Sequence, residues 1–160
     1  QEMRKTVVLL ALLLNRAWLS AQNFKEITNY EFKAPKDYQE QENTVSACAN
    51  YLFANPTNEE EYQRAVAQKF IMDWMIGTPD YTLNFGDGFM EVTKGNEDLV
   101  GMYMAATTKV ILDNNSEKSL SDKAIHSQSV DLLVAYCQDK NNKLKPSKAL
   151  KKIIKANKKS

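Results

Sequence analysis

The stretch that decides the fold runs from residue 97 to residue 112 and reads EDLVGMYMAATTKVIL. Apolar or uncharged residues recur in it at helical spacing on two faces: Leu99, Met102, Tyr103, Ala106 and Val110 on one, and Val100, Met104, Thr107 and Ile111 on the other. Apolar residues on most sides predict a central, largely buried helix. Gly101 and Ala105, four residues apart, would let a neighbouring helix approach closely.

Helical periodicity continues on both sides of this segment. Apolar positions recur at three- and four-residue intervals over residues 37–54 and again over residues 58–77. Two more amphipathic helices are predicted over residues 121–138 and 146–157. Ser121 can cap the first, and the second starts at Pro146 or Ser147. The chain is therefore predicted to be all-α, a compact bundle of four to five helices.

Residues 78–95 are the one stretch that leaves two structures open. Residues 81–85 alternate apolar and polar side chains, and Gly86-Asp87-Gly88 is a turn signal, so residues 81–93 could form a short β-hairpin. An irregular loop that carries a short helical turn is the alternative.

The N-terminal residues have the features of an export signal. Arg4 and Lys5 precede nine uncharged residues from Thr6 to Leu14, and Ser20-Ala21 follow as small residues. This order predicts a secretory signal peptide over residues 1–21 that is cleaved after Ala21. The apolar run is about half the ~20 residues that a transmembrane helix needs. An uncleaved anchor and a buried helix are the alternatives. We expect residues 22–160 to form one helical domain that is periplasmic or secreted.

Charge is distributed unevenly along the chain. Residues 143–160 contain eight lysines and no acidic residue, whereas residues 22–142 contain ten basic and nineteen acidic residues. The lysine-rich tail either folds back on an acidic surface or is offered to an anionic partner.

The basic surface of the tail consists of Lys148, Lys151, Lys152 and Lys155. We expect this helix to pack its apolar stripe on the domain and to leave its lysines in solvent. Attraction to an anionic membrane surface is an alternative. Nucleic acid is not an expected partner, because the chain is predicted to be exported and its tail has no arginine to read bases.

Cys48 and Cys137 both fall on the inward faces of their predicted helices. A disulfide is permitted in an oxidising compartment, and a bridge closing so long a loop is worth about 4–5 kcal/mol on the chain-entropy model. We predict that the two cysteines pair, with two buried free thiols as the alternative.

The sequence indicates no metal, cofactor or catalytic site. His126 is the only histidine, and no cysteine or histidine stands at metal-ligand spacing from it. Asp113, Asn115 and Glu117 alternate like calcium ligands of an EF-hand. However, lysine stands where that loop needs glycine, and alanine stands where it needs glutamate.

One further group of residues, Asp73, Trp74, Asp80 and Tyr81, is a candidate pocket. Two carboxylates near aromatic rings, with Asp87 and Glu91 farther along, could bind or cleave a sugar if they lay about 5–9 Å apart. Helix-surface and turn chemistry is the simpler interpretation.

Three segments resemble the second half of the Tai-like periplasmic immunity proteins of type VI secretion: residues 101–106 (GMYMAA), 129–136 (SVDLLVAY) and 144–150 (LKPSKAL). Those small exported helical proteins bind and neutralise a cell-wall-cleaving effector. This chain lacks the several cysteines of that family near its final helices and carries a basic tail that the family does not lead us to expect. The resemblance transfers no binding residues.

We expect an exported, non-catalytic interaction protein that binds another protein in the cell envelope, and the resemblance implies an immunity role as one version. A small cell-wall or carbohydrate-active enzyme that uses the 73–91 region is an alternative. A protein that binds the envelope surface through its lysine-rich tail is another.

Overall fold

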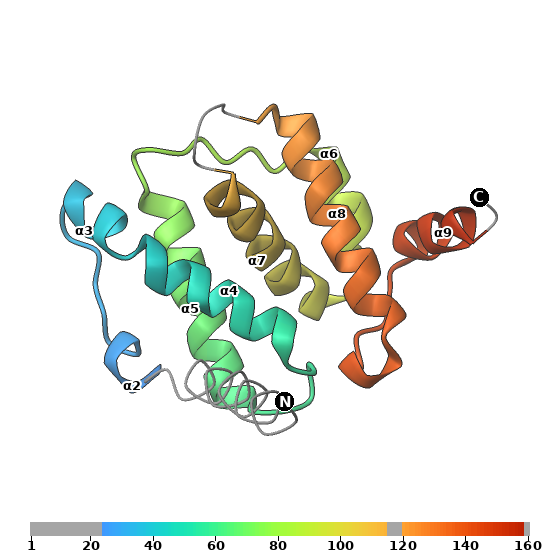
Figure 1. Ribbon diagram of the computed structural model, residues 1–160, viewed down its shortest axis with the longest axis horizontal. Coiled ribbons are helices and arrows are strands. Elements are labelled where there is room, and N and C mark those ends of the chain that lie inside the picture. The colour runs from blue at the N-terminus through green and yellow to red at the C-terminus, as the bar shows by residue number, and fades with distance from the viewer. Residues whose placement is uncertain (1–23, 115–119, 159–160) are drawn as a thin grey trace, which may run out of the picture.

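The computed structural model describes residues 24–114 and 120–158, and the predicted signal peptide at residues 1–21 lies outside them (Figure 1). Within these ranges the chain is helical, without strands, as predicted. The helices are α2 (Phe24–Ile27), α3 (Pro35–Glu40), α4 (Glu42–Ala54), α5 (Glu61–Gly77), α6 (Asp87–Thr93), α7 (Glu97–Asp113), α8 (Asp122–Gln138), a 3-10 turn η1 (Lys140–Asn142) and α9 (Lys148–Asn157). Five of those described have ten or more residues, which confirms a bundle of four to five main helices.

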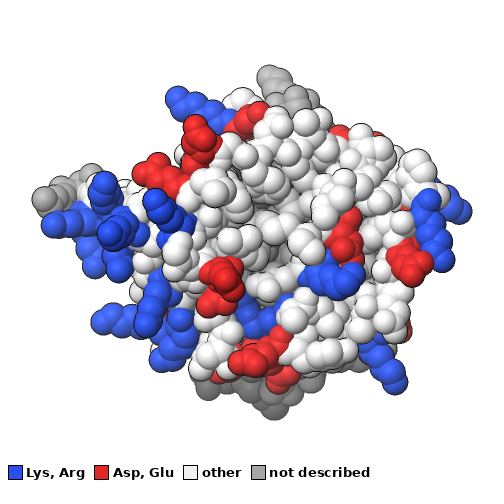
Figure 2. Space-filling model, turned by 180° about the vertical axis from the view of Figure 1, so that it is seen from behind, with Lys and Arg blue, Asp and Glu red and all other residues white. Residues whose placement is uncertain are grey.

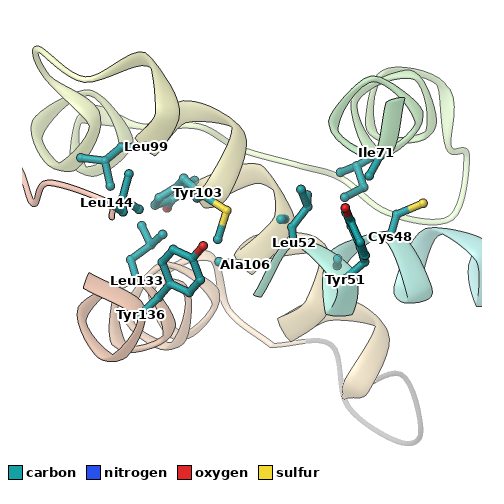
Figure 3. Packing of buried hydrophobic residues seen from close by; sticks show 14 of the residues in the cluster. Cys48, Tyr51, Leu52, Ile71, Leu99, Tyr103, Ala106, Leu133, Tyr136 and Leu144 are labelled. Atoms are coloured by element: carbon teal, nitrogen blue, oxygen red, sulfur yellow. The ribbon is translucent and has the colours of Figure 1, made fainter. Parts of the chain in front are cut away.

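Helix α7 occupies the centre of the bundle and packs against α4, α5, α6 and α8 (Figure 1). This is the helix that the 97–112 stretch predicts, and both of its faces are used. Leu99 and Met102 are completely buried, and so are Ala105 and Ala106. Figure 3 shows side chains of α7 between those of α8 on one side and those of α4 and α5 on the other.

The predicted close approach to α7 occurs at Gly101. A Cβ atom added at this glycine would lie 2.5 Å from Nε2 of Gln68, which belongs to α5. Ala105, one turn later, is fully buried. Gly101 therefore lets α5 and α7 pack tightly.

The hairpin considered for residues 81–93 is not formed. Residues 81–86 are irregular, and residues 87–93 form helix α6. Phe89 packs against the core and Val92 is buried within it. Side chains three residues apart share a helix face but point to opposite faces of a strand. Only the helix lets both reach the core.

A buried arginine joins four helices near the C-terminal end of α4. Arg64 of α5 is only 5 % exposed, and its Nη1 donates to the carbonyl oxygens of Leu52 (3.2 Å) and Asn55 (3.0 Å). Its Nη2 lies 3.3 Å from Sδ of Met102 on α7, and the Tyr136 hydroxyl of α8 donates to the same Asn55 carbonyl at 2.5 Å. The guanidinium thus satisfies carbonyl groups that the end of α4 leaves without partners.

Replacing Arg64 with alanine should lower the free energy of unfolding by about 3 kcal/mol or more, because it leaves buried carbonyls unpaired and opens a cavity. Urea unfolding followed by circular dichroism measures this loss. Lys69→Ala, an exposed change on the same helix, is the matched control and should stay within about 0.5 kcal/mol. Equal losses in both variants would contradict this role of Arg64.

Candidate functional site

A shallow open groove lies where α6 ends and α7 begins. Its volume is about 1150 Å³, and it is lined by Phe89, Met90, Glu91, Thr93, Lys94, Gly95, Asn96, Glu97, Asp98 and Val100. We call it the α6–α7 groove. The turn between the helices is tight because Gly95 adopts a left-handed conformation, with φ of 77°.

The α6–α7 groove exposes large apolar side chains. Met90 is 65 % exposed and Val100 is 36 % exposed, while Phe89 beside them is half-buried. Phe89 is held by its neighbours: its ring centroid lies 5.1 Å from that of Phe85 and 5.2 Å from that of Tyr103. The apolar part of the groove is therefore a supported surface on two helices.

The rim of the groove is charged and predominantly acidic. Glu91, Glu97 and Asp98 are exposed carboxylates, and Lys94 is the one lysine among the groove-lining residues. An apolar centre with a polar rim is the arrangement found in protein–protein interfaces.

Asn96 joins this groove to the segment that leads into α9. Its side-chain oxygen accepts a hydrogen bond from the Asp98 amide at 3.0 Å, so it caps α7. Its Nδ2 donates to the carbonyl oxygen of Lys145 at 2.7 Å. This side chain therefore adds a hydrogen bond to the packing of α6 against α9 and links the groove to the lysine-rich end of the molecule.

Helix α9 confirms the helix predicted over residues 146–157, with Ser147 as its N-cap. Leu150 is completely buried, and Ala149, Ile153 and Ile154 pack against the core. The predicted basic residues Lys148, Lys151, Lys152 and Lys155 are all exposed. Figure 2 shows lysine side chains gathered at one end of the molecule, where α9 lies.

The structure places the four residues of the predicted carboxylate–aromatic pocket in different roles. Trp74 is a core residue whose Nε1 donates to the Tyr38 carbonyl oxygen at 3.0 Å. Asp73 pairs with Lys69 on its own helix, whereas Asp80 accepts from Nε2 of Gln39 at 3.0 Å. The two carboxylates therefore have partners on different helices.

Tyr81 lies next to Trp74, with ring centroids 5.5 Å apart. Burial, and then the nearby Glu42 carboxylate, raise the pKa of Tyr81 to about 12. The hydroxyl remains protonated at neutral pH and donates to Oε1 of Glu42 at 3.2 Å. Trp74 and Tyr81 thus make structural contacts with each other and with α3 and α4.

His126 has a partner that the sequence did not indicate. Its Nδ1 lies 2.7 Å from the Tyr103 hydroxyl. Burial raises the pKa of Tyr103, so this hydroxyl is protonated at neutral pH and can donate to Nδ1. Gly88 makes room for the ring, since a Cβ there would lie 2.6 Å from Cε1 of His126. The pair joins α6, α7 and α8.

The predicted disulfide is not formed, because Cys48 and Cys137 are both free and buried. Cys48 lies on α4 and lines a cavity with Phe24 and Ile27 of α2, whereas Cys137 lies on α8. Helix α7 packs between α4 and α8, and Figure 3 shows Cys48 far from Tyr136, the residue before Cys137. The sequence pattern predicted that both thiols face inward, but it could not predict which side chains each thiol would contact.

Three further findings concern metal binding, the calcium-like pattern and membrane spans in the described residues. Within residues 24–114 and 120–158, no group of three or more histidine, cysteine, aspartate or glutamate side chains could hold a metal ion. Asp113 ends α7 and pairs with Lys109, while Asn115 and Glu117 lie outside the described ranges. In the same part of the chain, no helix combines the length and the apolar content required to cross a membrane.

No protein-family model, curated protein or solved structure matches this chain. The α6–α7 groove is therefore the candidate site on its geometry alone. Sequence reasoning missed Met90 and placed Val100 on an inward face. The available signal was the Lys94-Gly95-Asn96 turn between two helices, which marks their junction without showing which side chains remain exposed there.

Both thiols should react slowly in the folded protein and completely after unfolding. Burial raises the pKa of Cys48 to about 12 and that of Cys137 to about 11, so very little reactive thiolate exists at neutral pH. Ellman's reagent should detect two thiols per chain in guanidinium chloride without reductant and almost none in the native state. Fewer than two thiols in denaturant would instead indicate a bridge.

Asn96→Ala should destabilise the junction of α7 and α9 by about 1–2 kcal/mol, because it removes a helix cap and a second hydrogen bond. Hydrogen exchange should accelerate at the Leu150 and Lys151 amides at the start of α9. Ser121→Ala removes the N-cap of α8 in the same way and is the control for global destabilisation. Acceleration of the same size in both variants would argue against a local link through Asn96.

Proposed function

We propose that this chain is an exported, non-catalytic interaction protein that binds another protein in the cell envelope through the α6–α7 groove. The exposure of Met90, at 65 %, beside exposed Val100 in a groove with a charged rim carries this proposal. A large apolar side chain held in a concave, polar-edged surface gains most when a partner removes it from water.

The composition of the groove favours a protein as its partner. Methionine is flexible and polarisable, and is often used where a surface must adapt to another protein. The carboxylates of Glu91, Glu97 and Asp98 favour a partner whose apolar side chain is flanked by basic residues. These carboxylates are exposed, which suits pairing with a partner. Acid–base catalysis usually depends on burial to shift a pKa.

The resemblance to Tai-like immunity proteins suggests one specific version of this function. In that version the partner is a cell-wall-cleaving enzyme, and binding would block access to its active site. The groove residues come from 89–100, just before the segments that carry the resemblance. The interface would therefore be a property of this chain and not one transferred from that family.

A photo-crosslinking amino acid at position 90 should yield one discrete protein adduct in cell envelopes, which mass spectrometry would identify. The same amino acid at position 76 tests a competing apolar surface, because Ile76 on α5 is 78 % exposed. An adduct at position 76 and none at position 90 would assign the interface to α5 and contradict the groove.

With the partner identified, Met90→Asp should weaken its binding at least tenfold, because it puts a carboxylate in an already acidic groove. The melting temperature should hardly change, since Met90 is mostly exposed. Unchanged affinity measured by calorimetry would exclude Met90 as the anchor of the interface.

A further inference from the structure

Helix α9 presents all its lysines on one side. At about 100° per residue, the four lysines of α9 (Lys148, Lys151, Lys152 and Lys155) and Lys158 at its C-cap fall within an arc of about 120°, roughly opposite the buried Leu150. They extend over about 15 Å of helix. All five are exposed. Nothing acidic interrupts this face, because α9 contains no aspartate or glutamate.

No ion pair in the part of the chain that the structure describes includes one of these lysines. The ion pairs found in residues 24–114 and 120–158 involve Lys33, Lys69 and Lys109. Lys143 and Lys145, which precede the helix, are exposed as well. Figure 1 shows α9 at one end of the bundle, on the side away from α3, α4 and α5. Its exposed lysines therefore lie at an end of the molecule, as Figure 2 also shows.

We propose that the lysine face of α9 docks the protein on an anionic lipid bilayer. The face is convex and contains lysines without arginine or aromatic side chains. Lysine acts as a mobile point charge and does not impose the bidentate geometry of arginine. Such an array suits a flat surface of laterally mobile anionic headgroups better than the fixed geometry of a folded partner or the bases of a nucleic acid.

The contact is electrostatic and peripheral, because the apolar side of α9 is already used. Leu150 is completely buried, and Ile153 and Ile154 pack against the domain. An amphipathic helix that inserts into lipid needs a free apolar side, and this helix has none to offer while it stays packed. Binding should therefore weaken strongly when salt screens the lysines.

The test measures the full chain on phosphatidylcholine vesicles with and without about 30 mol% phosphatidylglycerol. The quantity compared is the partition coefficient on anionic vesicles divided by that on neutral vesicles. This ratio cancels any apolar contribution that both vesicles share, including one from the apolar residues 6–14. The wild type should prefer anionic vesicles, and about 0.5 M NaCl should abolish that preference. A ratio near one at low salt would overturn the proposal.

Two variants with the same change in net charge locate the contact. Lys148→Gln, Lys152→Gln and Lys155→Gln together should reduce the ratio on the order of a hundredfold, because each lysine contributes about fivefold. The control combines Lys25→Gln, Lys36→Gln and Lys123→Gln, which are exposed lysines on α2, α3 and α8, and should change the ratio far less. Equal effects of the two variants would show that binding depends only on the net charge of the protein, and would overturn the assignment to α9.

Competing ligands and the groove variant complete the test. Tighter binding to a DNA duplex or to polyglutamate than to anionic vesicles, at the same salt concentration, would overturn a lipid surface as the ligand. Met90→Asp should retain vesicle binding within about fivefold. If the wild type binds anionic vesicles but yields no protein adduct at position 90, the proposed function fails and the lipid contact stands. If it yields that adduct but does not prefer anionic vesicles, the lipid contact fails and the proposed function stands.

Discussion

The structure depends on how the chain ends helix α4, where the buried guanidinium of Arg64 meets the carbonyls of Leu52 and Asn55. A buried charge is costly unless hydrogen bonds and opposite charge compensate for it. Here the negative end of the α4 dipole supplies the opposite charge, and Tyr136 and Met102 reach the same place from α8 and α7. The loop that follows α4 is also fixed here, because Thr57 donates to the Asn142 carbonyl through both its amide and its hydroxyl. Four helices and two loops therefore share one polar junction at the edge of an apolar core.

With one end of the bundle held in this way, α7 acts as the axis from which the candidate site is built. Its buried faces fix its position, so its first turn emerges at a defined place beside α6. At the start of α7, the Asn96 side chain makes two hydrogen bonds: it caps the helix and it donates to the Lys145 carbonyl. The groove and the lysine-rich helix are neighbours in space because α6 packs against α9 and because Asn96 binds the Lys145 carbonyl, although about 50 residues separate Asn96 from Lys145 in the sequence.

Much of the architecture could be predicted because its determinants are local. The periodicity of residues 97–112 predicts α7 and its burial, and the capping residue Ser121 predicts the start of α8. Features that depend on tertiary packing could not be predicted. Cys48 and Cys137 both lie on inward faces as expected, yet α7 stands between their helices. Methionine is usually a core residue, and only the packing of α6 on α7 shows that Met90 is exposed. The importance of Arg64 was equally hidden, because its partners are backbone carbonyls that no sequence pattern marks.

The uneven charge of the chain allowed the lysine-rich tail either to fold back on the acidic body or to stay exposed. The apolar stripe of α9 decides between these two outcomes. Had the lysines folded back on the acidic body, ion pairs would have neutralised both surfaces. Instead Leu150 anchors the helix by its apolar side, and this rotation forces the lysines outward. A fully buried leucine contributes about 1.5–3 kcal/mol, more than an exposed ion pair usually returns. Hydrophobic burial therefore wins over charge neutralisation, and the molecule keeps an acidic groove beside a basic helix. The two proposed contacts, with a protein at the groove and with lipid at α9, therefore use surfaces of opposite charge.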